Sequence, residues 1–185
     1  MRKALYILSV LEDTDLEWMA HKGSIERVPA QSELISEGQV TASLYFVLDG
    51  ELAVRAGGAD GTEIARLLSG EIVGEMSFVD TRPPSASVVA VQDSLVLALD
   101  RALLTRRLEQ DSGFAARFYK AIAKFLADRL YVTTGRFGYG SHRQDVDVDQ
   151  IDDDAMEDVS MASLRFDQFL KRLRSDYRSR SAGVV

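Results

Sequence analysis

The segment spanning residues 70–88, GEIVGEMSFVDTRPPSASV, contains the residue types best suited to binding a small anion. Gly74 permits positive φ angles and a close approach of the backbone to a ligand. Residues 75–79 are predicted to form a short helical turn whose free N–H groups would face an anion. Pro84 ends any helix, and the small residues 85–87 leave the next backbone accessible. These features indicate a phosphate-binding loop between two strands, although a plain strand–turn–strand corner fits them about as well.

The elements that must position this loop are mostly short strands. β-Branched runs alternate with Gly, Asp and Pro, and the predicted strands are 25–28, 33–35, 44–48, 51–55, 63–68 and 87–98. The glycine-rich residues 57–61 predict a hairpin turn. Many short strands joined by turns are typical of a barrel or jelly roll, so we expect a mainly β fold with flanking helices.

Three helices are predicted around these strands. A capping box that begins at Thr14 predicts a helix over 15–21, which Gly23 should end. A short amphipathic helix is predicted over 101–110, and a longer one, capped by a serine, over 113–134. The longer helix has one apolar face, made of Phe114, Phe118, Ile122, Phe125, Leu126 and Leu130.

Three ordered motifs carry a family resemblance. Residues 74–78 and 84–88 resemble the two halves of the ligand cassette of cyclic-nucleotide-binding domains. Residues 34–38 are similar to that family's apolar-apolar-x-Glu-Gly turn, and residues 44–51 to its Leu-Tyr-aromatic-Val-x-x-Gly strand. The resemblance covers about residues 10–135. It implies a β-roll of the kind found in the catabolite activator protein and the protein kinase A regulatory subunit, followed by C-terminal helices.

The resemblance also implies a set of ligand-binding residues. Glu75 matches the acid that binds the ribose 2′-hydroxyl, although a structural acid that accepts from neighbouring amides fits the residue equally well. Ser85 matches a position whose amide contacts the phosphate. The full set of candidates is Gly74, Glu75, Met76, Ser77, Arg82, Ser85, Ala86, Thr133 and Thr134.

One residue departs from the family pattern. Pro84 stands where the family has the Arg that pairs with the cyclic phosphate. Arg82 precedes it by two residues and would have to reach across about 7 Å of extended chain. Its guanidinium suits phosphate, but a solvated turn residue is the simpler interpretation. We therefore expect cyclic AMP and cyclic GMP to bind weakly or not at all, and no cofactor or metal is expected.

The end of the long helix carries two further expectations from the resemblance. Thr133 and Thr134 match two hydroxyl positions that meet the purine in the catabolite activator protein, but solvated or helix-terminal threonines fit them as well. The apolar face of the helix predicts packing against the β-roll. In the family this helix also forms a dimer seam and a lid over the ligand, so a homodimer is expected.

Composition excludes several classes of protein. A net charge of −7 argues against a general nucleic-acid binder. The chain has no cysteine, which fits a reducing cytoplasm, and no apolar run approaches the ~20 residues of a membrane span. With two histidines and no serine elbow, Walker loop or metal-ligand cluster, an enzyme is not expected.

The predicted sensor domain spans residues 1–134. The residues that follow it form two segments of opposite charge. A glycine-rich and acidic linker is predicted over 135–158, where residues 145–158 carry eight acids and no base. Asp145 begins a calcium-loop spacing that fails at its sixth and twelfth positions, so no calcium site is expected. Residues 159–180 carry six bases and predict an amphipathic helical tail.

This tail allows three interpretations. It could dock on its own β-roll, bind a partner protein, or lie on an anionic membrane, and docking requires nothing beyond the chain. Only about 50 residues follow the long helix, which leaves no room for a winged helix-turn-helix. A regulatory sensor that signals through protein contacts is therefore expected. The alternatives are a scaffold without a nucleotide ligand and a DNA-binding regulator of the catabolite-activator type.

Overall fold

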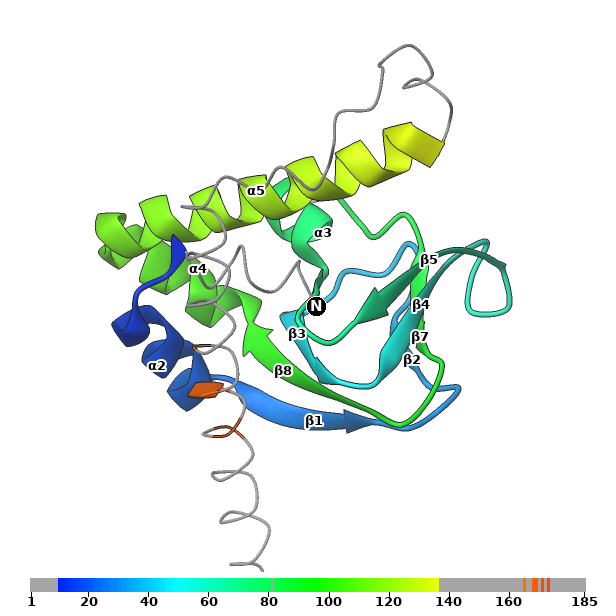
Figure 1. Cartoon of the computed structure of the whole chain (residues 1–185), viewed down its shortest axis with the longest axis horizontal. Coiled ribbons are helices and arrows are strands. Elements are labelled where there is room, and N and C mark those ends of the chain that lie inside the picture. The colour runs from blue at the N-terminus through cyan, green and yellow to red at the C-terminus, as the bar shows by residue number, and fades with distance from the viewer. Residues whose placement is uncertain are drawn as a thin grey trace, which may run out of the picture.

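The computed structural model describes residues 10–80 and 82–136, together with Arg165, Gln168, Phe169, Lys171 and Leu173. Two antiparallel sheets of four strands face each other and form a β-roll (Figure 1). Their strands are β1 (Ser24–Val28), β2 (Glu33–Ile35), β3 (Ser43–Asp49), β4 (Glu51–Ala56), β5 (Thr62–Leu68), β6 (Ile72–Val73), β7 (Ser87–Ala90) and β8 (Ser94–Asp100). The predicted mainly β fold with flanking helices is confirmed.

The order of strands explains where the loop of residues 74–86 lies. One sheet has the order β1-β8-β3-β6 and the other β2-β7-β4-β5. The loop leaves β6 in the first sheet and returns as β7 in the second. It therefore crosses between the sheets at one end of the roll. In the second sheet, β4 and β5 form the predicted hairpin.

The predicted strand over 87–98 is wrong, because this run divides into β7 and β8, which belong to different sheets. The chain turns at residues 91–93. Asp93 holds this turn to the neighbouring one, since its carboxylate accepts a hydrogen bond from the Ala30 N–H (2.9 Å) and pairs with Arg27. The two-residue strand β6 was missed because it is too short to show a periodic pattern.

The helices correspond to the predicted ones with shifted ends. Helix α2 (Asp13–Lys22) begins two residues early, because Glu12 and Asp15 form the capping box instead of Thr14 and Glu17. Gly23 ends it as predicted, with its N–H bonded to the Met19 carbonyl. Helix α3 (Glu75–Asp80) is the predicted helical turn, and α4 (Arg101–Gln110) matches its predicted range.

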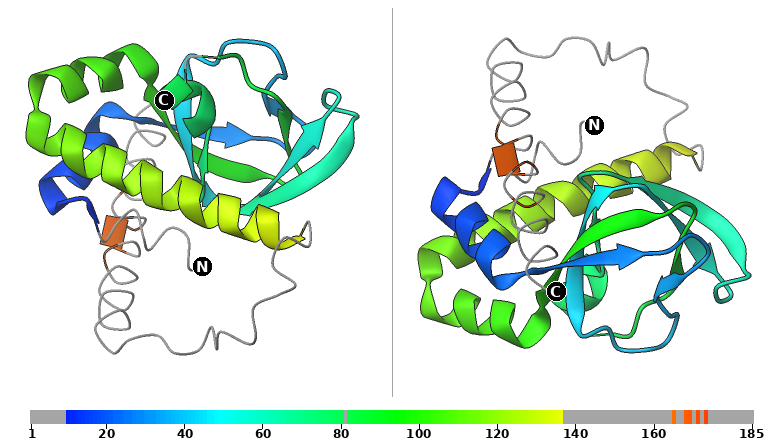
Figure 2. Two further views of the ribbon diagram at one scale, coloured as in Figure 1. Left: turned by 90° about the horizontal axis from the view of Figure 1, so that it is seen from above. Right: turned by 90° about the horizontal axis from the view of Figure 1, so that it is seen from below.

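Helix α5 (Ser112–Arg136) lies along one side of the β-roll (Figure 2). Its cap is Asp111, whose carboxylate accepts from the Phe114 N–H (2.9 Å), and not the predicted serine. It also runs two residues into the stretch predicted as linker. The predicted apolar face is buried as far as Phe125, but Leu130 is 64% exposed, so the last turns lack a covering layer within the described part of the chain.

The described tail residues are helical and pack against the domain. Phe169 and Leu173 are buried in the same apolar cluster as Leu16 of α2 and Leu97 of β8. Among the three interpretations of the tail, docking on the chain itself is the one seen here, with α2 providing part of the seat. The predicted acidic linker lies outside the described residues apart from its first two positions.

None of the helices in the described part of the chain combines the length and apolar character that a membrane span requires.

Candidate functional site

A cavity of about 350 Å³ lies where the loop between β6 and β7 crosses from one sheet to the other. Its apolar wall comes from strand residues of both sheets, namely Ile35, Val54, Leu67, Val73 and Val88. Its polar rim comes from α3, from the loop that follows it, and from Arg129 of α5. The cavity therefore combines an apolar interior with charged groups from three separate segments, as small-molecule sites commonly do.

Gly74 sets the direction of α3 at the entrance to this cavity. Its φ is 88°, a left-handed conformation that L side chains rarely adopt, which explains the glycine. Its carbonyl accepts from the Phe78 N–H (3.0 Å) and closes the first turn. This turn directs Glu75 inward, so that only 2% of the residue is exposed, while Met76 on the same helix is 58% exposed.

Glu75 forms an ion pair with Arg129, which lies 54 residues later in the sequence. The Arg129 Nη1 donates to Glu75 Oε1, and Nη2 donates to the Ile72 carbonyl (3.2 Å). The same guanidinium lies 3.7 Å from Glu71 Oε2 and stacks 4.6 Å from the centre of the Phe125 ring. One cation of α5 therefore contacts two buried carboxylates and a backbone carbonyl at the cavity rim.

Burial raises the pKa of the Glu75 carboxyl above its usual value, and the nearby Glu71 charge adds to this. Arg129 and the Glu75 amide oppose the shift without cancelling it. The charged form of Glu75 is therefore poorly solvated by its surroundings, and a ligand group that donates a hydrogen bond to this carboxylate would improve its environment.

Arg82 lies at the mouth of the cavity but its side chain is 83% exposed and pairs with Asp80. This is the solvated turn position that the sequence suggested as the simpler interpretation. Pro84 lines the cavity and its carbonyl accepts from the Gly38 N–H (2.8 Å), which ties the loop to the β2–β3 turn. Pro84 therefore brings neither a charge nor an N–H donor to the lining of the cavity.

Seven of the nine predicted site residues line this one cavity: Gly74, Glu75, Met76, Ser77, Arg82, Ser85 and Ala86. Thr133 and Thr134 lie apart from it on exposed turns of α5. Their hydroxyls donate to carbonyls of their own helix, to Arg129 (2.8 Å) and Leu130 (2.9 Å) respectively. The structure gives these hydroxyls helical partners, and their contact with a purine stays a prediction.

Arg129 is the site residue that sequence reasoning missed. It opens the segment Arg129–Thr134 that resembles the long helix of the catabolite activator protein, but the hydroxyl residues of that segment drew attention instead. The sequence did contain an indication of its role. Arg129 follows the buried Phe125 by four residues and therefore lies on the helix face that packs against the roll. Within the described ranges, no group of three acidic, histidine or cysteine residues is arranged to hold a metal ion.

Comparison with known proteins agrees with this geometry. The family model of the cyclic nucleotide-binding domain matches residues 25–111. A cyclic nucleotide-binding domain from Methylobacillus flagellatus KT superposes with a TM-score of 0.65 at 24% identity, covering 72% of this chain and 80% of that one. This structural likeness shows the shared fold.

Two curated relatives add to this result. The chain is 28% identical over 115 residues to the Pycsar effector protein XpPycTIR of Xanthomonas perforans, covering 62% of this chain and 37% of that protein. It is 38% identical over 86 residues to the cyclic AMP receptor protein of Thermus thermophilus, covering 43% of this chain and 39% of that protein. The chain spans less than two fifths of either relative's length.

Residues 25–111 therefore match the cyclic nucleotide-binding domain family, within a chain that is similar to the catabolite activator protein of Thermus thermophilus. Domains of this fold usually act as regulatory sensors.

Proposed function

We propose that this domain is a non-catalytic sensor for a small anionic ligand of the cyclic nucleotide class, with Glu75 and Arg129 as its central polar contacts. The observation that carries the proposal is their ion pair, buried at the rim of a cavity of about 350 Å³. Glu75 can accept from ligand hydroxyls, and the Arg129 guanidinium can donate to a phosphate in the same space.

The affinity of this site for cyclic nucleotides is expected to be low. Loss of a charge-assisted, bidentate phosphate contact at Pro84 costs about 2–4 kcal/mol, or roughly 30- to 1000-fold in affinity. Arg129 compensates for part of this loss only if it exchanges Glu75 for the phosphate. Arg82 would have to leave Asp80 to help, and its exposed side chain has no other anchor among the described contacts.

Calorimetry with cyclic AMP, cyclic GMP, cyclic CMP and cyclic UMP tests the proposal. Binding of at least one nucleotide should be measurable in the range of tens of micromolar or weaker, and Arg129→Met should weaken it by roughly tenfold or more. Arg66→Met is the matched control, because Arg66 pairs with Glu51 and Glu63 on the β4–β5 hairpin and does not line the cavity.

Two results would contradict parts of this proposal. A submicromolar dissociation constant for the unmodified protein would show that Pro84 does not limit affinity. An affinity that Arg129→Met leaves unchanged would remove Arg129 from the site.

Ligand binding is proposed to be communicated to a protein partner through contacts of the C-terminal helices. Tyr119, Leu130 and Tyr131 of α5 expose 49%, 64% and 75% of their surface, which suits a homodimer or another protein partner. Sedimentation of the unmodified protein and of Leu130→Asp distinguishes the two. A dimer that the substitution dissociates supports the homodimer, and a monomer at all concentrations contradicts it.

A scaffold without a nucleotide ligand is the second candidate. The charges at the cavity favour it, because Arg82 is paired with Asp80 and Arg129 with Glu75, and neither needs a ligand for compensation. Failure of all four nucleotides to bind a folded protein at millimolar concentration would put this candidate first.

A further inference from the structure

The described tail residues hold one side of helix α2. Phe169 and Leu173 have 9% and 1% of their surface exposed and join the apolar cluster that contains Leu16. Arg165 pairs with Asp13 (2.7 Å) and also donates to the Leu11 carbonyl (2.7 Å), directly before α2 begins. The tail therefore fixes the N-terminal end of α2 with both apolar and polar contacts.

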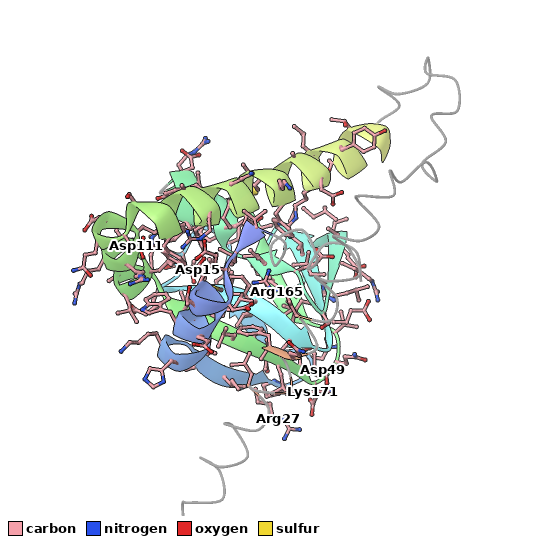
Figure 3. The ribbon with its side chains drawn as sticks, turned by 60° about the vertical axis from the view of Figure 1, so that its left-hand side comes forward. Asp15, Arg27, Asp49, Asp111, Arg165 and Lys171 are labelled. Carbon is pink, nitrogen blue, oxygen red and sulfur yellow. The ribbon has the colours of Figure 1, made fainter. Side chains whose placement is uncertain are left out.

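Helix α5 holds the same end of α2 through a different pair. Arg117 donates two hydrogen bonds to the carboxylate of Asp15, at 2.7 and 2.9 Å, and lies 3.1 Å from Glu12. Only 1% of Asp15 is exposed. Figure 3 labels Asp15, which belongs to α2, together with Arg165 of the tail and Asp111, which directly precedes α5. The first turn of α2 is thus the point where α5 and the tail meet.

The cavity connects to this point through α5. Arg117 and Arg129 lie on one uninterrupted helix of 25 residues, about 18 Å apart along its axis. If α5 shifts as a rigid unit, both arginines shift with it. A continuous series of contacts therefore runs from Glu75 to Arg129, along α5 to Arg117 and Asp15, and through α2 to the tail.

We propose that the tail is a latch on α2 whose hold depends on the Glu75–Arg129 pair. When a ligand draws Arg129 away from Glu75, α5 shifts, Arg117 pulls the first turn of α2, and the seat of the tail is lost. The Glu75–Arg129 pair and the contacts of the tail with α2 are each either formed or broken. Coupling between distant sites requires two such discrete states. The inference rests on the proposed function only in naming the cavity as the regulated site.

Amide hydrogen exchange over residues 165–173 tests the latch without any ligand. In Arg129→Met the exchange should be roughly tenfold faster or more than in the unmodified protein, and in Glu75→Gln it should also rise. Arg66→Met, remote from both ends, should leave it within about twofold. Exchange in β3 and β8 must stay slow in every variant, which shows that the β-roll remains folded.

Tryptophan fluorescence gives a second measurement. Trp18 of α2 is the single tryptophan of the chain, and its ring lies 5.6 Å from the Phe114 ring of α5 and 5.7 Å from the Arg107 guanidinium. Movement of α2 against α5 should change its emission in Arg129→Met and not in Arg66→Met.

Three outcomes separate this inference from the proposed function. Tail exchange that Arg129→Met and Glu75→Gln both leave at the unmodified rate overturns the latch, whatever binds the cavity. Faster amide exchange in the tail of these variants, together with no nucleotide binding at millimolar concentration, supports the latch and contradicts the proposed ligand class. Nucleotide binding that speeds tail exchange in the unmodified protein, and no longer does so in Arg117→Met, supports both.

Discussion

Arg117 and Arg129 of α5 each pair with a buried carboxylate, yet the two pairs differ in character. Asp15, with 1% of its surface exposed, receives a bidentate guanidinium and the Glu12 N–H. Burial raises its pKa, but the bonds from Arg117 and from the backbone outweigh burial and hold the pKa below its ordinary value. Glu75, with 2% exposed, meets Arg129 through one oxygen beside a cavity, and burial keeps its pKa raised. The first pair is a completed structural contact, and the second is one that a ligand could improve.

The largest expected effect concerns the tail, on the side of the Asp15 pair. Phe169→Asp with Leu173→Asp removes two buried side chains worth about 1.5–3 kcal/mol each and places charges in their seats. We expect exchange over residues 165–173 to rise at least about a hundredfold, while the β-roll stays protected. Lys171→Asp is the matched control, because Lys171 is exposed on the same segment. Fast exchange in the unmodified protein would show that the docked tail is not the dominant state in solution.

The next effect compares the two carboxylates directly. Asp15→Asn should lower the free energy of unfolding by about 2 kcal/mol, since it weakens charge-assisted hydrogen bonds in a buried site. Glu75→Gln should cost less than about 1 kcal/mol, because burial already disfavours the charged form. Urea unfolding of both variants measures the difference. Equal losses would mean that the two pairs are equivalent structural contacts and that the cavity pair is not poised for a ligand.

The third effect supplies the missing cation. Pro84→Arg should strengthen binding of a cyclic nucleotide by about 1.5–3 kcal/mol, or roughly 10- to 150-fold, provided that the rest of the cavity is competent. Pro84→Gln controls for the loss of proline without adding charge. A folded Pro84→Arg protein that binds no better than Pro84→Gln would show that the cavity itself, and not this one residue, prevents binding.

The smallest effect is on the pH dependence of stability, where the two carboxylates have opposite signs. The pKa of Asp15 is lowered in the folded state, so its contribution is present above its unfolded value of 3.8 and is lost as pH falls through the folded pKa. The pKa of Glu75 is raised, so its contribution is present below 4.5 and is lost as pH rises through the folded pKa.

Unfolding measured from about pH 3 to about pH 7 should therefore show two distinct changes. Asp15→Asn should reduce the loss of stability at the acid end, and Glu75→Gln should reduce the loss above about pH 4.5. A Glu75→Gln curve parallel to that of the unmodified protein would mean that the Glu75 pKa is not raised.

Local sequence patterns determined most of the fold, because strand propensity, glycine turns and helix periodicity act over a few residues. The cassette from Gly74 to Ala86 was found from its own residues, and the structure gathers its named members at one cavity. The α5 face was also predicted as far as Phe125, since a buried helix face repeats with the helical period.

Tertiary structure alone decided the features that depend on residues far apart in the chain. The partner of Glu75 lies 54 residues away, and no local pattern indicates that Arg129 meets it. The break between β7 and β8 depends on the sheet that each half joins, since both halves are apolar runs that predict a strand. The seat of Phe169 and Leu173 follows from α2, which presents an apolar surface that only the assembled domain creates. Periodicity shows that a side chain will be buried, whereas the contact that buries it depends on how distant segments pack.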